Sequence, residues 1–344
     1  MTFESHFLDI LEKYKVISII GLAKNVSKTT TLNHILRILK EKTKLGLTSI
    51  GRDGEKYDII SYFPKPRILV EKGTLIATAQ ESIHNCEVPI EIIKNTEIST
   101  PIGDILIVKI LGNGYIELAG PSINVYLSKV CNELFELGCE FIIVDGAFDR
   151  RSYAAPLISD ATILSTGASV SESMEDVIEL TSHTIKLLTI KNELNQDIIN
   201  ISKEIMHNSK LGIIGSDNSV TIIDVPTALD AAKDIFRNLK EDSKYIVIKG
   251  AITDKLLKDV MKFTNSFKGK IFLVEDGTKL FLSRKTLGMF EKKGGTLKVL
   301  NPITIAALTI NPTSPFGYAF NKHKFLRSLE ERISIPVFDL GPSD

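Results

Sequence analysis

The amino-acid sequence predicts an α/β protein with a larger N-terminal domain and a smaller C-terminal one. At 344 residues the chain is too long for a single ordinary hydrophobic core. A β-branched run at residues 16–22 contains a glycine near its end and leads into an amphipathic helical pattern. Beyond residue 211 the alternation of strand and helix patterns begins again. We therefore expect two parallel α/β layers, with residues 1–205 in the first domain and 206–344 in the second.

The first domain opens with a strand–helix–strand unit. After the strand at residues 16–22, apolar side chains recur between residues 32 and 39 with the spacing of one helix face. Residues 45–50 form the next expected strand, which is closed by Gly51-Arg52-Asp53-Gly54. Such a unit is expected to be right-handed, with its two strands parallel.

A β-rich insertion is expected between this second strand and the next helix, at about residues 67–118. Turn signals such as Gly112-Asn113-Gly114 separate its short β-rich runs, which predicts hairpins. The expected strands span residues 69–77, 91–97, 105–110 and 115–118.

The remainder of the chain returns to alternating helices and strands. An apolar helix face at residues 123–137 precedes expected strands at 141–144 and 161–165. Ser169 and Glu172 have the spacing of a capping box for the long helix that follows. In the second domain the expected strands are residues 211–214, 245–248, 271–274 and 297–300, and the expected helices are 228–239, 255–263 and 283–292.

Composition and charge argue against several classes of protein. Lys plus Arg and Asp plus Glu both number 42, so a zero net charge gives no basis for sequence-independent nucleic-acid binding. The apolar runs are only strand-length, so no membrane span is expected. Cys86, Cys131 and Cys139 form no CxxC pair and are expected to be small buried side chains. The N-terminus lacks the basic start of a signal peptide, so we expect a cytoplasmic location.

The segment at residues 21–30 carries the strongest chemical signal. Because it connects a strand to a helix, its backbone N–H groups and the helix N-terminus form a concave anion site. It approximates the P-loop pattern G-x-x-x-x-G-K-[ST], in which Lys28 reaches the β- and γ-phosphates of ATP and Thr29 holds Mg²⁺. The first domain is therefore expected to have a P-loop NTPase-like parallel sheet. The expected nucleotide-binding residues are Gly21, Lys24, Asn25, Ser27, Lys28, Thr29 and Thr30.

This loop departs from the P-loop pattern at two positions. Its first glycine is one residue early, and Ser27 replaces the glycine before the lysine. If residue 27 requires a positive φ, serine costs free energy there that glycine would not. Weaker nucleotide binding or slower turnover would follow. Taken alone, the loop has an alternative interpretation as a helix start without a ligand.

Two aspartates follow strands that are expected to end at the same edge of the sheet. Asp145 comes directly after an apolar strand, the position of a Walker-B carboxylate that orients Mg²⁺ or its water. Asp53 lies in the glycine-flanked loop after the second strand, on the side of the γ-phosphate. Ligands of open parallel sheets gather outside the carboxyl ends of the strands. We therefore predict that Thr29, Asp53 and Asp145 hold Mg²⁺.

Three arginines on loops at this edge are candidates for stabilising charge on a transferring phosphoryl group. Arg52 is the first choice because it adjoins Asp53, and Arg150 and Arg151 lie on a second loop. The predicted catalytic residues are therefore Arg52, Asp53 and Asp145. For each arginine the alternative is a surface residue or an ordinary ion pair.

Five phrases of the sequence together resemble one family. They are GLAKNVSKTTTLN (21–33), GLTSIGRDGE (46–55), LAGPS (118–122), VDGAFDRRSYAAP (144–156) and DATILSTGAS (160–169). In combination they are similar to the P-loop accessory protein encoded beside lysine 5,6-aminomutase, the adenosylcobalamin- and PLP-dependent enzyme of anaerobic lysine fermentation. The resemblance covers about the N-terminal half, and the family's loop usually has glycine where this chain has Ser27.

This resemblance implies one subunit of an ATP-dependent reactivase, which works with a MutS-like partner subunit on an aminomutase client enzyme. It also implies phosphate and Mg²⁺ contacts for Lys28 and Thr29, and the Walker-B role for Asp145. Two other hypotheses remain open. One is a small-molecule kinase or ATP-dependent ligase of the dethiobiotin-synthetase kind, and the other is a nucleotide-binding module without turnover, which Ser27 favours.

Overall fold

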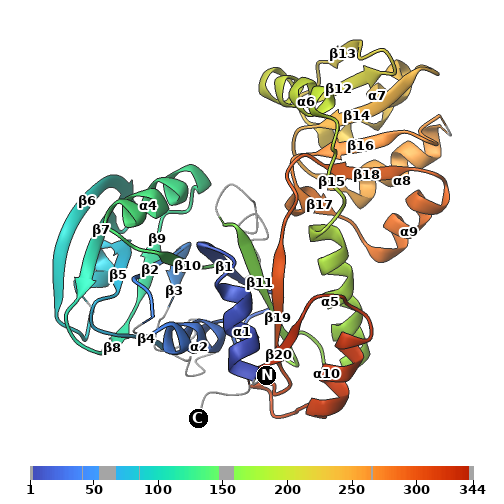
Figure 1. The fold of residues 1–344 in the computed structure, drawn as a ribbon. Helices are drawn as coiled ribbons and strands as arrows, with labels where there is room; N and C mark the ends of the chain where they lie inside the picture. The colour runs from blue at the N-terminus through green and yellow to red at the C-terminus, as the bar shows by residue number, and fades with distance from the viewer. Residues whose placement is uncertain are drawn as a thin grey trace. The chain divides into compact units, whose positions relative to one another are not determined.

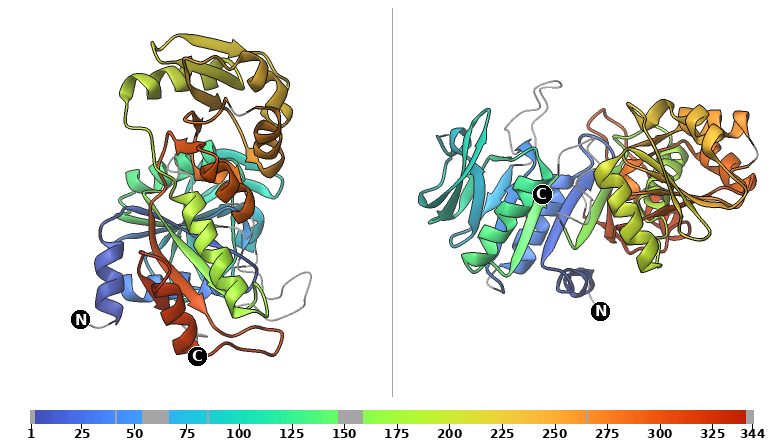
Figure 2. Two further views of the ribbon diagram at one scale, coloured as in Figure 1. Left: turned by 90° about the vertical axis from the view of Figure 1, so that its right-hand side faces the viewer. Right: turned by 90° about the horizontal axis from the view of Figure 1, so that it is seen from above.

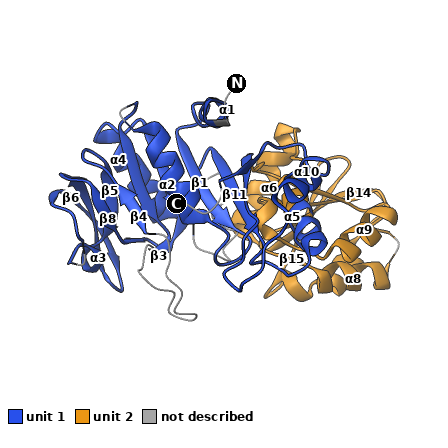
Figure 3. Ribbon diagram, turned by 90° about the horizontal axis from the view of Figure 1, so that it is seen from below, with its two compact units in different colours: residues 1–182, 304–344 blue, residues 183–303 orange. Residues whose placement is uncertain are grey.

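The computed structural model describes residues 3–40, 42–53, 67–84, 86–146, 159–264 and 266–340, with the side chains of Phe3, Arg52 and Asp53 outside the description. These residues form a mixed α/β protein with ten α-helices (Figure 1). The chain divides into two compact units, which Figure 3 shows in two colours. Unit 1 contains Met1–Ser182 and Thr304–Asp344, and unit 2 contains His183–Ile303. No helix among the described residues is long and apolar enough to cross a membrane.

Unit 1 is built on a nine-stranded sheet in the order β20-β19-β11-β1-β10-β2-β5-β7-β6. Seven strands are parallel: β1 (Val16–Gly21), β2 (Leu45–Ser49), β5 (Leu75–Ala79), β10 (Phe141–Asp145), β11 (Ala161–Gly167), β19 (Ile305–Asn311) and β20 (Val337–Asp339). The antiparallel strands β7 (Gly103–Ile110) and β6 (Ile90–Thr100) complete one edge. The central strands are almost wholly buried because both of their faces are covered by helices.

Alternate residues of the central strands face two different helical layers. Ile19 and Ile143 pack in one core with Leu32 and Ile35 of α2 (Lys28–Leu39). Helix α1 (Phe3–Leu11) contacts α2 (Figure 1 and Figure 2). Its buried side chains belong to the same core. Helix α4 (Asn124–Glu136) covers the other face, where Leu134 lies close to Gly46 of β2. The α2 face is the one that matters for the candidate site.

The predicted β-rich insertion is present, but it extends the main sheet. Its strands are β4 (Ile68–Val70), β5, β6, β7, β8 (Gly114–Ile116) and β9 (Leu118–Gly120), with the short helix α3 (Gln80–His84) between β5 and β6. The single strand expected at residues 69–77 is wrong. A turn whose Gly73 has φ 99° separates β4 from β5, so that β5 can run parallel to β2.

The predicted capping box at Ser169 and Glu172 is wrong, because helix α5 (Met174–Leu188) begins later. Ser173 caps it instead, with its Oγ accepting a hydrogen bond of 3.2 Å from the Asp176 backbone N–H. Ser169 Oγ donates 2.9 Å to the Lys24 carbonyl oxygen. Sequence spacing fits both serines equally well, and the loop contact decides between them.

Unit 2 has a five-stranded sheet in the order β13-β12-β14-β16-β18. Three of its strands are parallel as predicted: β14 (Ser243–Ile248), β16 (Ile271–Val274) and β18 (Thr296–Val299). The parallel direction expected for the first strand is wrong, because β12 (Leu211–Gly215) runs antiparallel to β14. It forms a hairpin with β13 (Val220–Ile223), whose turn contains Asn218 at φ 65°. The helices of this unit include α6 (Gln196–Asn208), α7 (Ala232–Asn238), α8 (Asp254–Phe263) and α9 (Arg284–Lys292).

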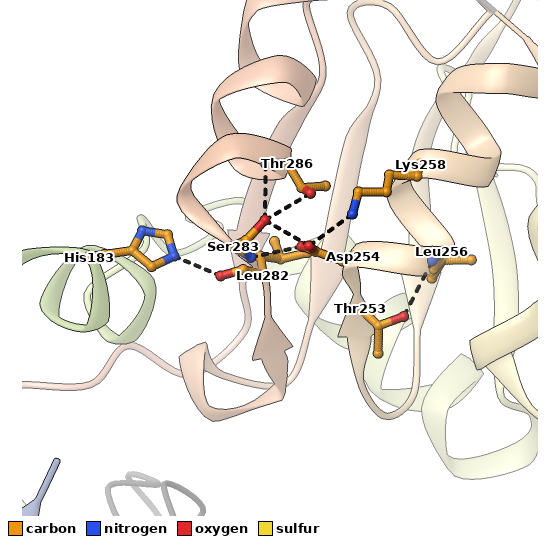
Figure 4. Close-up of polar contacts among 8 residues, drawn as sticks. All are labelled: His183, Thr253, Asp254, Leu256, Lys258, Leu282, Ser283 and Thr286. Carbon is orange, nitrogen blue, oxygen red and sulfur yellow. Dashed lines mark hydrogen bonds and ion pairs between the residues drawn. The ribbon is translucent and has the colours of Figure 1, made fainter. Parts of the chain in front are cut away.

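Two helix N-termini of unit 2 are joined by one carboxylate (Figure 4). Asp254, the first residue of α8, accepts hydrogen bonds of 2.7 Å from both the backbone N–H and the Oγ of Ser283. Ser283 in turn caps α9, accepting from the Thr286 backbone N–H at 3.3 Å. Lys258 Nζ lies 3.2 Å from Asp254 Oδ2. Burial raises the pKa of the Asp254 carboxyl, but the bonds from Ser283 outweigh it and hold that pKa below its ordinary value.

The predicted division at residues 205 and 206 differs from the two units of the structure. Unit 2 begins within α5, at His183, and the chain then returns to unit 1 as β19, which pairs with β11. Helix α10 (Lys322–Glu330) and β20 follow in unit 1. A strand pattern gives no indication of which sheet the strand joins, so this return was not foreseen.

Candidate functional site

The loop after β1 closes tightly on itself. A Cβ added to Gly21 would lie 2.7 Å from Val26 Cγ2 and 3.0 Å from Lys28 Cδ. Glycine is therefore required where the strand ends, and the stem of Lys28 lies against this point. Val26 is buried and anchors the middle of the loop. Gly21 and Lys28, both predicted as nucleotide-binding residues, thus lie close together in this loop.

Two residues of this loop have left-handed backbone conformations. Asn25 has φ 60° and Ser27 has φ 64°. Ser27 directly precedes α2, and its carbonyl oxygen accepts from the backbone N–H and the Oγ1 of Thr31 at 2.9 and 3.0 Å. Residue 27 therefore has the positive φ at which serine costs more free energy than glycine. For a non-glycine residue this cost is on the order of 1–2 kcal/mol. Such strain collects at functional sites.

The α2 face of the sheet changes from apolar to polar at the carboxyl ends of its strands. Leu47, Ile143 and Ile163 belong to the core. Two residues further along each strand, on the same face, the chain has a polar side chain. We call these residues the polar row: Ser49 on β2, Asp145 on β10, Ser165 on β11 and Thr309 on β19, with Gly21 at the end of β1 between them. All four side chains are buried.

Asp145 is a fully buried carboxylate on the strand next to β1. It is in register with Ile19 of β1 on one side and with Ser49 of β2 on the other. Gly146 follows because a Cβ there would lie 2.5 Å from the Ile19 carbonyl oxygen. The Gly146 N–H donates to that oxygen at 2.9 Å. The Asp-Gly pair thus fixes the end of β10 against the strand that leads into the loop.

Ser49 was not predicted, although it lies beside Asp145. Its Oγ is buried and has no hydrogen-bond partner among the residues that the structure describes. An unsatisfied buried hydroxyl costs free energy, so such a group in a native fold calls for an explanation. The period-2 continuation of Leu45 and Leu47 onto the same face is the signal that indicates Ser49.

A chain of hydroxyl groups connects α2 to the far side of the polar row. Thr31 Oγ1 lies 3.0 Å from Thr309 Oγ1, and Thr309 Oγ1 lies 2.8 Å from Ser165 Oγ. Thr31 is also the residue whose side chain binds the carbonyl oxygen of Ser27. Ser27, which has the left-handed conformation, is therefore connected through Thr31 to β19. The domain division predicted from the sequence places the residues of β19 in the C-terminal domain.

Neighbouring loops of unit 1 support the loop from outside. The Leu22 backbone N–H donates to the Ser165 carbonyl oxygen at 2.9 Å, and Ser169 Oγ donates to the Lys24 carbonyl oxygen. Tyr318 Oη donates 2.6 Å to the Ala168 carbonyl oxygen, from the segment that follows β19. These contacts fix the backbone of the loop, so its shape does not depend on its own side chains alone.

The predicted nucleotide contacts occupy different environments. Lys24 is exposed, whereas Lys28 and Thr29 are half-buried in the first turn of α2. Thr30 is buried beneath that turn. Lys28, Thr29 and Asp145 thus come from adjacent strand ends at one edge of the sheet, as the sequence predicted.

Arg52 and Asp53 form the end of β3 (Gly51–Asp53), which pairs antiparallel with β9. The pairing places their backbone just beyond the carboxyl end of β2. Their side chains, and all of Arg150 and Arg151, lie outside the described residues. The structure therefore leaves their predicted roles as predictions.

No group of three His, Cys, Asp or Glu side chains among the described residues could hold a metal ion by itself. Cys131 and Cys139 are buried and unpaired, and burial raises the pKa of their thiols to about 12 and about 11. These two thiols stay protonated, as expected for small buried side chains.

Comparison of the chain with protein-family models, curated proteins and solved structures found no match. The chemistry of the site rests on its own residues. The site combines a strained loop before a helix N-terminus, a half-buried lysine, a buried carboxylate and buried hydroxyl groups at one sheet edge.

Proposed function

We propose that this edge of unit 1 binds ATP with Mg²⁺ in the manner of a P-loop NTPase. The observation that carries the proposal is the register of β1 and β10, which puts the buried Asp145 beside the strand that leads into the Lys28 loop. A helix N-terminus and backbone N–H groups favour phosphate there. The oxygen groups of Thr29, Ser49 and Asp145 are of the type that Mg²⁺ prefers.

In this proposal each residue has a separate task. Lys28 neutralises charge on the β- and γ-phosphates, and the Thr29 hydroxyl and Asp145 hold Mg²⁺, which screens the phosphate charge. Asp53 and Arg52 act from β3 on the γ-phosphate side, the carboxylate on water and the guanidinium on developing charge. Ser27 keeps the loop in a conformation that glycine would adopt at lower cost.

We further propose that nucleotide turnover serves a partner enzyme, as one subunit of an ATP-dependent aminomutase reactivase. All five phrases that resemble that family include residues near this edge, in the loop, β2–β3, β9, β10 and β11. A switch that holds loops ordered while the γ-phosphate is present suits such a task.

The test is reactivation of a lysine 5,6-aminomutase that has been inactivated during turnover. Activity should return only when this protein, a MutS-like partner subunit, ATP with Mg²⁺ and fresh adenosylcobalamin are all present. Recovery without ATP would contradict the proposed role of the site. Phosphorylation of a metabolite without any recovery would support the kinase or ligase hypothesis instead.

A nucleotide-binding module without turnover is the second candidate, and the strained Ser27 is the observation that favours it. It predicts tight ATP binding with no phosphate release, either alone or with partners. Measuring phosphate release over hours beside an ATP titration separates the two candidates.

A further inference from the structure

We propose that a cavity at the other end of α2 binds a small organic polyanion, a compound that carries two or more phosphate or carboxylate groups. The cavity has a volume of about 460 Å³. It is lined by the last turn of α2, the turn into β2 and the turn between β4 and β5. These segments lie at the amino ends of β2 and β5, opposite the edge that holds Gly21 and Asp145.

The charge of the lining is predominantly positive. Lys40, Lys44 and Lys72 come from three separate segments, and Glu71 is the one carboxylate among the lining residues. Lys40 Nζ lies 3.1 Å from Glu71 Oε2, which leaves the charges of Lys44 and Lys72 in surplus within this lining. Glu140 is outside the lining, but it accepts from Thr43 Oγ1 and the Lys44 backbone N–H, and its charge interacts with that of Lys44. Converging positive charges in a concave site attract a polyanion.

The turn that presents Lys72 is held in place. The Lys72 backbone N–H donates to Asn113 Oδ1 at 2.9 Å, and the Gly73 N–H donates to the Ile110 carbonyl oxygen at 2.8 Å. A Cβ on Gly73 would meet no atom within 4 Å, so the backbone of the turn borders open space. A turn fixed before binding loses little conformational entropy when a ligand arrives.

A second cavity of about 190 Å³ adjoins the first and shares Lys44, Leu45 and Gly73 with it. It adds Lys109 together with the apolar side chains of Leu75, Ile93 and Leu137. The pair of cavities therefore offers a cationic compartment beside a small apolar one. This combination matches an organic polyanion, since apolar surface with a few placed charges is typical of small-molecule sites.

A purely structural explanation covers two of these lysines. Basic residues at a helix C-terminus are stabilised by the helix dipole, which accounts for Lys40 at the end of α2 and for Lys44 near the end of α4, where a Cβ on Gly138 would lie 3.3 Å from Lys44 Nζ. Lys72 belongs to a turn outside both helices and forms no ion pair with a carboxylate of the cavity lining. The convergence of all three lysines on one cavity is what the proposal explains.

The experiment is a calorimetric titration of the full-length protein with inorganic pyrophosphate at low salt. Pyrophosphate also fits a phosphate-binding loop, so the titration is repeated with Lys28→Ala to remove that contribution. The variant Lys44→Gln with Lys72→Gln tests the cavity, and Lys203→Gln with Lys324→Gln is the matched control for lost surface charge. All four lysines are exposed, so melting temperatures should stay close to that of the unchanged protein.

We expect pyrophosphate binding to persist in Lys28→Ala and to weaken at least tenfold when Lys44 and Lys72 are also replaced. The control pair should change it less than twofold. Loss of all binding in Lys28→Ala alone would overturn the cavity proposal while leaving the nucleotide proposal intact. Unchanged binding after replacement of Lys44 and Lys72 would overturn it as well.

Discussion

Both units have polar side chains at or just beyond the carboxyl ends of parallel strands, but the two sets of side chains differ in their hydrogen bonding. In unit 2, Asp254, Ser283 and Thr286 follow the parallel strands β14 and β16 and bond to one another (Figure 4). In unit 1, the polar row lies at the carboxyl ends of β2, β10, β11 and β19, and Ser49 Oγ is buried without a partner among the described residues. The first arrangement is complete by itself, whereas the second retains hydrogen-bonding capacity.

The backbone shows the same difference. At the edge of unit 1, Asn25 and Ser27 have positive φ within one loop, directly before a helix. In unit 2, helices α8 and α9 begin with capping residues in ordinary extended conformations, Thr253 and Ser283. A sheet of this class can therefore either satisfy the polar groups at its carboxyl edge with caps or leave a buried hydroxyl unsatisfied beside a strained loop. The unsatisfied hydroxyl and the strain together, and not the fold class, are the basis of the nucleotide proposal.

Replacing Asp145 with Asn should have the largest effect that distinguishes the carboxyl edge of unit 1 from that of unit 2. The change keeps the shape and removes a buried charge, so ATP turnover should fall at least a hundredfold, a loss of about 3 kcal/mol in transition-state stabilisation. Thermal stability without nucleotide should change little or rise, because an uncharged amide is easier to bury. Phosphate release and a melting curve measure the two quantities. A large loss of stability would make Asp145 a structural residue.

The corresponding change in unit 2, Asp254→Asn, should have the opposite profile. It disrupts the joint acceptor of two hydrogen bonds from Ser283, so the free energy of unfolding should fall by about 1–2 kcal/mol. ATP affinity and turnover should be unchanged. Chemical denaturation and calorimetry check this, and a change in nucleotide affinity would show that the two edges are not functionally distinct.

Replacing Ser27 with glycine tests the strain in the loop. Relief at φ 64° should tighten ATP binding or speed turnover by a few-fold, equivalent to about 1 kcal/mol. The matched control is Asn218→Gly, at φ 65° in the β12–β13 turn of unit 2. It relieves a similar conformation far along the chain, so nucleotide binding should not respond. Equal effects of both substitutions would mean that only global stability was measured.

The smallest expected effect is a change in the stability of the fold at acidic pH. The pKa of Asp254 is below its ordinary value of 3.8 in the folded protein, so its ionised form stabilises the fold. That contribution is fully present above about pH 4 and is lost as pH falls through the lower, folded pKa. Comparing denaturation of the unchanged protein and Asp254→Asn between pH 7 and pH 3 should show their stabilities converging. A constant difference across that range would contradict the shifted pKa.

Much of the architecture could be predicted from local patterns. The central strands, the helix after the loop and the β-rich stretch follow from hydrophobic periodicity, which is a local property. The break between β4 and β5, the direction of β12 and the return of β19 could not be predicted, because they depend on which strands pair in space. The inserted unit 2 separates Thr309 from Ser165 by 144 positions.

The residues of the candidate site also divide into those that local sequence patterns identify and those that only strand pairing reveals. Gly21, Lys28, Thr29 and Asp145 were evident because each belongs to a short motif beside a strand. Ser49 and Thr309 belong to no motif, and only the strand register shows that they share the face of Asp145. The side chains of Arg52 and Asp53 stay predictions.

The central claim is that the unit 1 edge binds nucleotide and the unit 2 edge does not. The most direct test is titration of ATP with Mg²⁺ into the unchanged protein, Lys28→Ala and Lys255→Ala, which removes a first-turn lysine from a helix in each unit. Lys255 forms an exposed ion pair with Asp230, so its loss should leave the fold intact. We predict that ATP affinity falls at least tenfold in Lys28→Ala and is unchanged in Lys255→Ala. Equal affinity in Lys28→Ala and the unchanged protein would contradict the account.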